Sequence, residues 1–543
     1  MQETIHYNTE RKSKTYLALL DSSSAFDLVW HSGLFVKMHD MGIGGKTWRL
    51  LFQSYQNMYS NIVLNGTISN DIQIKRSVRQ GSVLGPWLYM VYIHDLAVSL
   101  QTSAFGCKLG NTSCGGILQA DDIAIMALTP GALQELLTIC ETYSNTWRYK
   151  YNPVKSKVLV FGEGQRSKQL LQAERTFILY GNIIDEVSEC AHVGVTLNVF
   201  QNSTQQIANS VSKIRGGLMA IIGSGANGLS CCSTVKLYKT VVLPRGLYGA
   251  ELWSNISKTE LNKVELAHRF CLKFIQRMPK RTKTLIVQSM VNVFSMETYI
   301  DIRKLQFFGR LCVLSCNKLA KKVFIERLYQ YVLSQNNNNS CSGFIPDIVR
   351  VLKKYGLESY FESYLSTAVF PSKLNWKTII RSNVKLVEEI NLNAAFEDPS
   401  LKRFCQIYGN SLRVHPIWQL ENTTRGNRTF LRDFARLNGV ITSSDYNKVC
   451  VYCNDQFSDY LDHYIHECNK YTDTREYFWS LLINVFSVMI SSYLYNLEQS
   501  EMTEIILGKT PNCAISNNEQ WELLALSAKA WQLLVYEREL KFY

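Results

Sequence analysis

Proline is scarce in this sequence, and long apolar runs are missing from it. Only 10 of the 543 residues are proline, and one polar low-complexity tract occurs, at 334–340. This composition argues against a largely disordered chain. No apolar stretch approaches the roughly 18 residues that span a bilayer, and residues 1–20 carry charges without the apolar core of a secretory signal. We therefore expect a folded chain with neither a membrane span nor a secretory signal.

Apolar residues make up 46% of the chain, which is typical of proteins with buried cores. The length predicts three or four domains, at about 150 residues each. Without a secretory signal, the 15 cysteines are expected to be reduced intracellular thiols, so any cluster of them is a candidate metal site. The net charge of +13 is compatible with a polyanionic partner, although it is spread over a long chain.

Two adjacent aspartates, Asp121 and Asp122, lie between apolar residues in the stretch 118–125. The pattern predicts a β-hairpin with apolar strands and an acidic tip. Unpaired buried carboxylates are costly, and a divalent cation such as Mg²⁺ is the usual reason for such a pair. The alternative is an ordinary solvated turn, because aspartate is common in turns.

Two further stretches carry polar residues at the ends of apolar elements. Residues 15–21 predict a buried strand that ends in Asp21, followed by a helical pattern from 22 onward, in which Ser24 or Asp27 is alternatively a helix N-cap. Residues 79–96 predict a glycine-containing turn that leads into an apolar helix with Pro86 in its first turn. The residues just before such a helix are suited to phosphate or a base edge.

Taken in order, these stretches read D-x-x-x-A-F-D, R-Q-G-x-x-L-x-P and A-D-D. They are followed by Asn152-Pro-Val-Lys-Ser-Lys157 and by His192-Val-Gly-Val-Thr-Leu197. Five motifs in this order resemble the palm of a reverse transcriptase, most closely that of the non-LTR (LINE-type) retrotransposons. The resemblance implies an α+β fold: an antiparallel palm sheet packed on helices, then a helical thumb, then a mostly α-helical C-terminal region.

The resemblance also implies the chemistry of the site. Two Mg²⁺ ions would be held by Asp21 and Asp121, with Asp122 lining the same site, for nucleotidyl transfer onto a primer 3′-hydroxyl. Lys155 is the candidate for protonating or neutralising the pyrophosphate. Substrate-binding positions are Phe26 (the steric gate against a 2′-hydroxyl), Arg79, Gln80, Gly81 and Lys157, and the primer grip is His192, Val193 and Gly194.

The implied partners are an RNA template, a DNA primer or target DNA, and dNTPs, and the family's life cycle implies nuclear localisation. The chain departs from the family at Gln119, where an aromatic residue usually precedes A-D-D. Only 20 residues precede Asp21, so we expect the fingers and an upstream endonuclease to be missing through truncation. The alternative is an inactive remnant that only binds nucleic acid; a two-metal nuclease ranks third.

Beyond the palm motifs, 176–187 predicts a hairpin and the pattern is helical from about 201, with a second helix over 234–248. Residues 258–322 contain 14 lysines and arginines against 4 acidic residues, with phenylalanines interleaved. The combined positive charge of this stretch suits binding to a nucleic-acid backbone. The alternative for each residue taken alone is an ordinary position on a solvated helix face. The expected domains are 1–198 (incomplete palm), 199–333 (thumb and basic region), 334–340 (Asn-rich linker), 341–440 (helical, of unknown role) and 441–543 (C-terminal region).

The C-terminal region carries the spacing C-x2-C-x9-H-x4-C, formed by Cys450, Cys453, His463 and Cys468. Three thiolates and an imidazole make the tetrahedral ligand set of a closed Zn²⁺ site. His466 is a poorer fourth ligand, and unrelated reduced cysteines are the alternative. The spacing also resembles the cysteine-histidine element that follows the polymerase in many LINE-type proteins, which implies a zinc knuckle that holds RNA or DNA.

Overall fold

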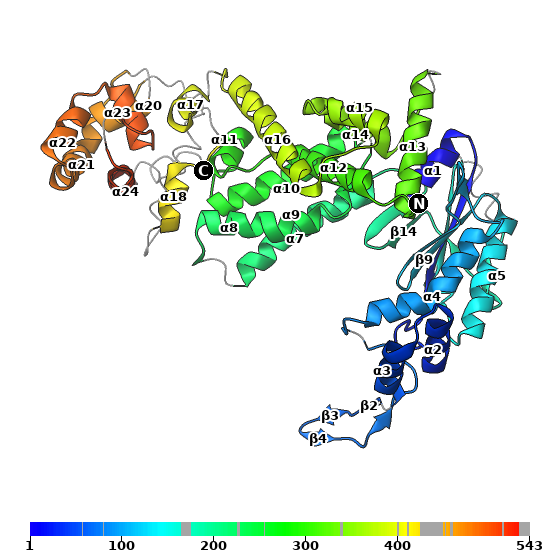
Figure 1. Cartoon of the computed structure of the whole chain (residues 1–543). Coiled ribbons are helices and arrows are strands. Elements are labelled where there is room, and N and C mark those ends of the chain that lie inside the picture. Colours follow the sequence, from blue (N-terminus) through cyan, green and yellow to red (C-terminus); the bar gives the residue numbers. More distant parts are fainter. Residues whose placement is uncertain are drawn as a thin grey trace.

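The computed structural model consists of a sheet-containing N-terminal part and a long helical part, which meet at an angle (Figure 1). It describes residues 1–531 apart from 57, 80, 164–174, 225–227, 255, 337–339, 399–400, 410–411, 424–448, 451, 457–459 and 513–514. Within these residues the mixed α/β character expected from the sequence is confirmed.

The N-terminal part is built on a five-stranded sheet with the order β13-β10-β1-β9-β8. β1 pairs antiparallel with β9 and β10, β8 pairs antiparallel with β9, and β10 pairs parallel with β13. The strands are β1 (Thr15–Asp21), β8 (Gly116–Gln119), β9 (Asp122–Ala127), β10 (Lys157–Phe161) and β13 (Asp185–Glu186). β1 is apolar on both faces because it is the central strand and both faces are covered.

Helices cover the two faces of the sheet unequally. On one face, Tyr16, Ala18 and Leu20 of β1 join a core with residues of α2, α4 and α5. On the other face, Leu17 and Leu19 meet residues of α1. The helices are α1 (Gln2–Glu10), α2 (His31–Asp40), α3 (Gly45–Gln56), α4 (Gly85–Thr102) and α5 (Pro130–Thr146).

Two predictions about these helices are settled by the structure. α4 begins as expected, with a proline in its first turn, where the missing N–H costs nothing. The helix expected after Asp21 begins only at His31, with Trp30 as its N-cap, so the prediction of an N-cap at Ser24 or Asp27 is wrong. Residues 23–28 form turns instead, because Ser24 has a positive φ and the amide of Ser23 donates to the carbonyl of Lys150.

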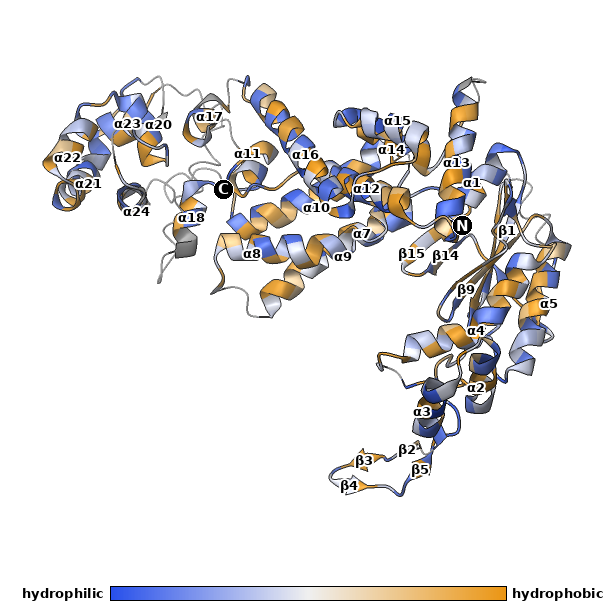
Figure 2. Cartoon of the chain, viewed as in Figure 1, coloured by the Kyte–Doolittle hydropathy of each residue, from blue (hydrophilic) through white to orange (hydrophobic). Residues whose placement is uncertain are grey.

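A hairpin arm projects from the N-terminal part between α3 and α4 (Figure 1). Its strands are β2 (Tyr59–Ser60), β3 (Val63–Leu64), β4 (Thr67–Ile68) and β5 (Ile72–Gln73), and all are exposed. Figure 2 shows that hydrophobic residues lie on this arm. Two short hairpins complete the part: β6 (Lys108–Leu109) with β7 (Thr112–Ser113), and β11 (Ile178–Leu179) with β12 (Asn182–Ile183). The hairpin expected over 176–187 is therefore confirmed in its centre, while 185–186 pairs with β10 instead.

The hairpin of β14 (Glu189–His192) and β15 (Val195–Asn198) lies between the two parts of the chain (Figure 1). From there on the elements that the structure describes are helices, as expected. The elements are α7 (Thr204–Gly223), α8 (Cys231–Leu237), the π-helix η2 (Tyr238–Val242), α9 (Leu243–Gly246), α10 (Lys258–Gln276), α11 (Thr284–Met290), α12 (Met296–Val313), α13 (Leu319–Asn336), α14 (Phe344–Lys354), α15 (Glu358–Thr367) and α16 (Lys373–Ala395). The second helix expected over 234–248 is thus a continuous run through α8, η2 and α9.

The expected linker at 334–340 begins inside α13, which continues to Asn336; residues 337–339 lie outside the described residues. Moreover, one hydrophobic cluster joins Leu305 and Phe308 of α12 to Ile348 of α14 and Trp376 of α16. The two sides of the expected boundary therefore share a core, because helices far apart in sequence bury their apolar faces against one another.

The C-terminal elements are α17 (Lys402–Tyr408), α18 (Pro416–Thr423), α20 (Tyr460–Asp462), the π-helix η5 (His463–Glu467), the 3-10 helix η6 (Asn469–Tyr471), α21 (Thr472–Val485), α22 (Val488–Tyr495), α23 (Gln499–Ile506) and α24 (Asn517–Trp531). Residues of α18, α21 and α24 join the same hydrophobic cluster as α7 and α10. Among the described residues, no helix has the length and apolar character of a membrane span.

Candidate active site and metal site

The acidic residues of the first and third motifs lie at one end of the sheet. Asp21, the last residue of β1, is directly opposite Asp122, the first residue of β9. Because side chains alternate along a strand, Asp21 shares a face with Leu17 and Leu19, and Asp122 shares that face with Ala124. The two carboxylates therefore emerge on the same face, with the Asp21 side chain 44% exposed. Directly opposite residues of an antiparallel pair have Cβ atoms roughly 4.5–5.5 Å apart.

Asp121 occupies the turn between β8 and β9, so the hairpin with an acidic tip is confirmed. The preceding residue, Ala120, has a φ of 53°, in the left-handed region that a tight turn requires. The turn lies beside the end of β1, because the hydroxyl of Ser22 donates to the carbonyl of Asp121 at 3.4 Å. The turn thus brings a third carboxyl-bearing residue to the strand end where Asp21 and Asp122 meet.

The asparagine of the fourth motif shapes the loop that carries Lys155. The side-chain oxygen of Asn152 accepts hydrogen bonds from the amides of Val154 and Lys155, which is an Asx-type turn. The amide of Asn152 donates to the carbonyl of Asp21 at 2.8 Å, so the turn is fastened to the end of β1. As a result, Lys155 Nζ lies 3.9 Å from Asp21 Oδ2.

Lys157 pairs with a different aspartate from the one beside Lys155. Its Nζ pairs with Asp185 Oδ2 at 2.7 Å and donates to the carbonyl of Val154 at the same distance. The lysine is on the sheet face of the aspartates, opposite Leu19 in the register, but its charge is taken up by the neighbouring parallel strand.

Phe26 is half-buried and stacks on Tyr89 of α4, with ring centroids 4.8 Å apart. The amide of Val78 donates to the carbonyl of Phe26 at 2.7 Å, so the chain that leads to Arg79 runs beside it. Arg79 and Gly81 are exposed, and Gly81 has a φ of 78° in open space. Gln80 lies outside the described residues.

The three expected primer-grip residues form the turn of the β14–β15 hairpin. His192 pairs with Val195, while Val193 and Gly194 both have positive φ. Burial lowers the pKa of His192, and the charge of Asp122 partly offsets this effect. The hairpin turn is therefore close enough to the acidic strand end for the two to interact electrostatically.

Several residues that the sequence analysis did not single out hold this arrangement together. Tyr89 is buried, which raises its pKa, and it hydrogen-bonds to Ser22 near Asp121. Ser156 is buried, and its hydroxyl accepts from the amide of Asp21 at 3.2 Å. The hydroxyl of Tyr248 donates to the carbonyl of Val193 at 3.1 Å. The sequence could have pointed to Tyr89, which lies in the helix after R-Q-G, and to Ser156, which lies within N-x-x-K-S-K. No sequence motif marks Tyr248.

The basic stretch 258–322 is only partly a surface. Lys304 is buried and pairs with Asp347 at 2.5 Å, and Lys321 is buried with its Nζ on the carbonyls of Leu311 and Cys312. The surface charge is therefore smaller than the residue count suggests. The exposed members are Lys258, Lys263, Arg277, Lys280, Arg281, Arg310, Lys318 and Lys322.

The phenylalanines of the same stretch also divide between surface and core. Phe270 and Phe274 are 43% and 46% exposed, whereas Phe308 is in the core.

Cys450, Cys453, His463 and Cys468 converge as a group. Each offers a ligand atom within 4.8 Å of the others, and in the described part of the chain no other group of three or more such residues does so. Cys450 Sγ is 3.7 Å from Cys468 Sγ, and Cys453 Sγ is 3.2 Å from His463 Nε2. The carboxylate oxygens of Asp21, Asp121 and Asp122 do not all lie within 4.8 Å of one another.

A turn and a helix position these four ligands. The amide of Asn454 donates to the carbonyl of Cys450, which closes a tight turn around the first pair. His463 begins the π-helix η5, and its Nδ1 contacts Glu467 Oε2 at 3.0 Å, which leaves Nε2 toward the thiols. His466 instead contacts the hydroxyl of Thr503 and does not belong to the cluster of four ligand atoms.

The electrostatics of the group favour a thiolate at Cys450, while desolvation and the neighbouring Cys450 raise the pKa values of Cys453 and Cys468. Burial disfavours ionisation of Cys450, but hydrogen bonds from the backbone of Cys453 and Tyr452 and from His463 lower its pKa to about 6. A thiolate is the form that binds metal. The donor set, a tetrad of three sulfurs and one imidazole nitrogen, therefore fits Zn²⁺.

Comparison with known proteins gives a consistent result. Residues 1–197 match the family described as reverse transcriptase (RNA-dependent DNA polymerase). The chain is 25% identical over 283 residues to the RNA-directed DNA polymerase from mobile element jockey of Drosophila funebris, and 25% identical over 323 residues to that of Drosophila melanogaster. These matches cover 51% and 58% of this chain, and 30% and 34% of the relatives, so the chain spans about a third of their length.

A further match is to the retrovirus-related Pol polyprotein from the type-1 retrotransposable element R2 of Popillia japonica, 28% identical over 147 residues. It covers 26% of this chain and 24% of that protein. The expected resemblance is thus confirmed at the level of a retrotransposon-type polymerase. Residues 1–197, which carry the acidic strand end, match the reverse transcriptase family and resemble the polymerases of LINE-type mobile elements.

Proposed function

We propose that this chain is an RNA-directed DNA polymerase of the LINE type, which adds deoxynucleotides to a primer 3′-hydroxyl. The observation that carries the proposal is the pairing of Asp21 with Asp122, with Asp121 on the adjoining turn. Residues from two distant parts of the sequence thereby bring carboxylates to one exposed strand end. A solvated turn alone would not require an acid on the neighbouring strand.

The carboxylates of Asp21, Asp121 and Asp122 are hard oxygen donors and would hold Mg²⁺. Two bound Mg²⁺ ions supply charge neutralisation at the attacking 3′-hydroxyl and at the leaving pyrophosphate. Lys155, 3.9 Å from Asp21, would neutralise or protonate the pyrophosphate as it leaves. As in other phosphoryl transfers, the residues would act mainly by positioning and charge stabilisation.

Two neighbouring groups would define the substrate. Phe26, held against Tyr89, would exclude the 2′-hydroxyl of a ribonucleotide. The turn 192–194, tied down by Tyr248, would support the primer end. In this proposal residues 1–198 form the palm and residues 199–333 form the thumb, whose exposed basic residues would contact the template–primer backbone.

The test is primer extension on an RNA template with Mg²⁺. We expect extension by the parent chain and none by Asp121→Asn with Asp122→Asn. The matched control removes two exposed aspartates elsewhere, Asp40→Asn with Asp473→Asn, and should extend like the parent. Equal background in the parent and the Asp121/Asp122 variant would refute the polymerase and leave a chain that only binds nucleic acid.

We also propose that Cys450, Cys453, His463 and Cys468 bind one Zn²⁺ in a closed site. The support is the convergence of the four ligand atoms and the contact from Glu467 that orients the imidazole. Four protein ligands leave no open position, so the ion would be structural and would help to present this region to RNA or DNA. We expect stoichiometric zinc in the purified parent and none in Cys450→Ser with Cys453→Ser; a zinc-free parent would overturn the site.

A further inference from the structure

The helix α16 buries one row of side chains and carries a row of cations along the flank of that buried row. Trp376, Ile380 and Val384 pack in the core with α12, and the indole Nε1 of Trp376 donates to the carbonyl of Leu305 at 2.8 Å. A second row at four-residue spacing, within about 100° of the buried row around the helix axis, is basic. Its members are Lys373, Lys377 and Arg381, which are exposed, followed by Lys385, which pairs with Glu389 at 3.5 Å.

These three cations have no electrostatic partner within the part of the chain that the structure describes. No ion pair involves Lys373, Lys377 or Arg381, and the sequence 372–386 contains no acidic residue. This distinguishes them from two buried lysines of the basic stretch: Lys304 pairs with Asp347, and Lys321 donates to the carbonyls of Leu311 and Cys312. At a rise of about 1.5 Å per residue, successive charges are about 6 Å apart along the helix, and the row spans about 12 Å.

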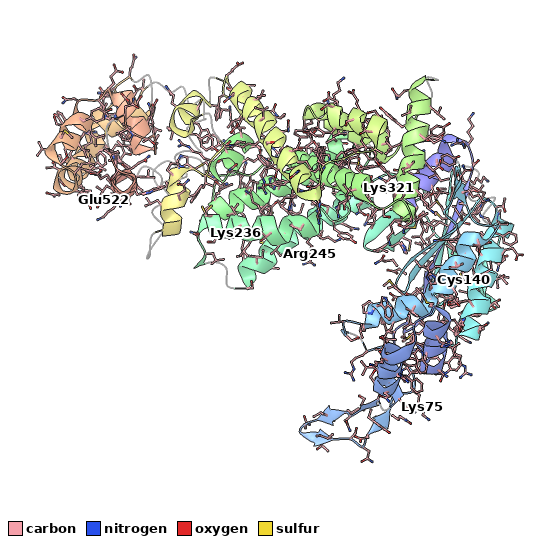
Figure 3. The ribbon with its side chains drawn as sticks, viewed as in Figure 1. Lys75, Cys140, Lys236, Arg245, Lys321 and Glu522 are labelled. Atoms are coloured by element: carbon pink, nitrogen blue, oxygen red, sulfur yellow. The ribbon has the colours of Figure 1, made fainter. Side chains whose placement is uncertain are left out.

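The row lies on a different side of the helical part from α7, α8 and α9. α7 packs on α10, α10 on α12, and α12 on α16, so two helices separate α7 from α16. In Figure 1, α16 lies along the upper edge of the helical part. Lys236 of α8 and Arg245 of α9 lie along the lower edge in Figure 3.

We propose that the row formed by Lys373, Lys377 and Arg381 binds the sugar–phosphate backbone of a nucleic acid outside the polymerase site. A single strand of duplex carries one phosphate per about 3.4 Å of helix axis, so the row of about 12 Å is long enough to face at least three phosphates, one for each cation.

An anionic membrane is the other polyanionic surface to consider. A helix that lies in a membrane interface needs a free apolar face. In α16 the apolar row of Trp376, Ile380 and Val384 is buried in the core with α12, and the exposed Leu374, Leu386 and Ile390 are spread around the helix and form no single apolar face, which favours the nucleic acid. The choice also rests in part on the proposed polymerase function, because that function brings the chain to long nucleic acids.

The test measures how the affinity for a duplex of about 40 base pairs changes between about 50 and 200 mM monovalent salt, by fluorescence anisotropy. The test variant is Lys373→Gln with Lys377→Gln and Arg381→Gln. The matched control keeps the charges: Lys373→Arg with Lys377→Arg and Arg381→Lys. We expect the test variant to lower the slope of log K against log salt by about 2.7, at about 0.9 per lost phosphate contact.

A slope of about 0.9 per contact means that each contact strengthens binding up to about eightfold when salt falls tenfold, from about 1 M to about 0.1 M. Each lost contact should therefore lower the affinity at about 0.1 M salt by up to this factor. The control variant should keep the slope of the parent. Circular dichroism and thermal unfolding of both variants establish that they are folded. Primer extension at saturating primer–template should proceed at the parent's rate in both, because the row lies outside the polymerase site.

Three results would overturn the proposal. One is a parent-like slope in the test variant. Another is an equally large decrease of the slope in the charge-keeping control, which would show that the effect comes from the shape of the side chains and not from their charge. The third is unchanged duplex binding together with lost binding to vesicles of anionic lipid, which would assign the row to a membrane. If the parent fails to extend a primer, the polymerase proposal fails, while the slope comparison still decides the role of the row.

Discussion

The contact between His463 and Glu467 makes a sharp prediction about the proposed zinc site. Glu467 Oε2 lies 3.0 Å from His463 Nδ1, while His463 Nε2 faces Cys453 Sγ. The carboxylate thus fixes which nitrogen carries the proton and how the imidazole is oriented. Replacing Glu467 by glutamine removes the negative charge but keeps the shape of the side chain.

The magnitude follows from the exposure of the glutamate. Loss of such an outer partner typically costs 10- to 100-fold in metal affinity. The Glu467 side chain is 49% exposed, so water can take over part of its role. We therefore expect the lower end of the range, about tenfold, which corresponds to about 1.4 kcal/mol.

The assay is competition for zinc with a chelator of known affinity. The matched control is Glu476→Gln, which removes an exposed glutamate on α21 and should bind zinc like the parent. Equal zinc affinity of the parent and Glu467→Gln would show that the contact does not orient the ligand. Glu467 would then have no role in metal binding, even if the four ligands bind the metal.

Three further predictions concern stability. Gly309→Ala should lower the free energy of unfolding by about 1–3 kcal/mol, because the new Cβ would lie 2.1 Å from Trp376 Cδ1; Gly216→Ala, in open space, should not lower it. Burial lowers the pKa of Lys37 from 10.5 to about 8, so the folded state binds fewer protons between these values, and stability should rise with pH there. Urea unfolding of Lys37→Met should lack this rise, and its persistence would contradict the assignment. Arg327→Met should cost about 3–5 kcal/mol in urea unfolding, because it leaves two partly buried glutamates on α1 unpaired; parent-like unfolding would show that the pairs are replaceable.

The sequence by itself was enough for elements whose signal is local. The strand 15–21 shows a continuous apolar run, the hairpin at Asp121 shows apolar strands around an acidic tip, and the helix after Pro86 shows its own start signal. The four zinc-ligand candidates could be chosen in the same way, because closed metal sites use short, fixed spacings. The order of the motifs was enough for the resemblance that the comparisons support.

Tertiary structure alone decided which side chains meet. The register between β1 and β9 sets Asp21 opposite Asp122, and a shift of one residue would have sent the two carboxylates to opposite faces. Packing decided that Lys304 and Lys321 are buried while Lys373, Lys377 and Arg381 stay exposed. The residue type alone does not show whether a lysine is buried or exposed, because this depends on which residues the folded chain places beside it. That depends on contacts between residues far apart in sequence, which local patterns do not encode.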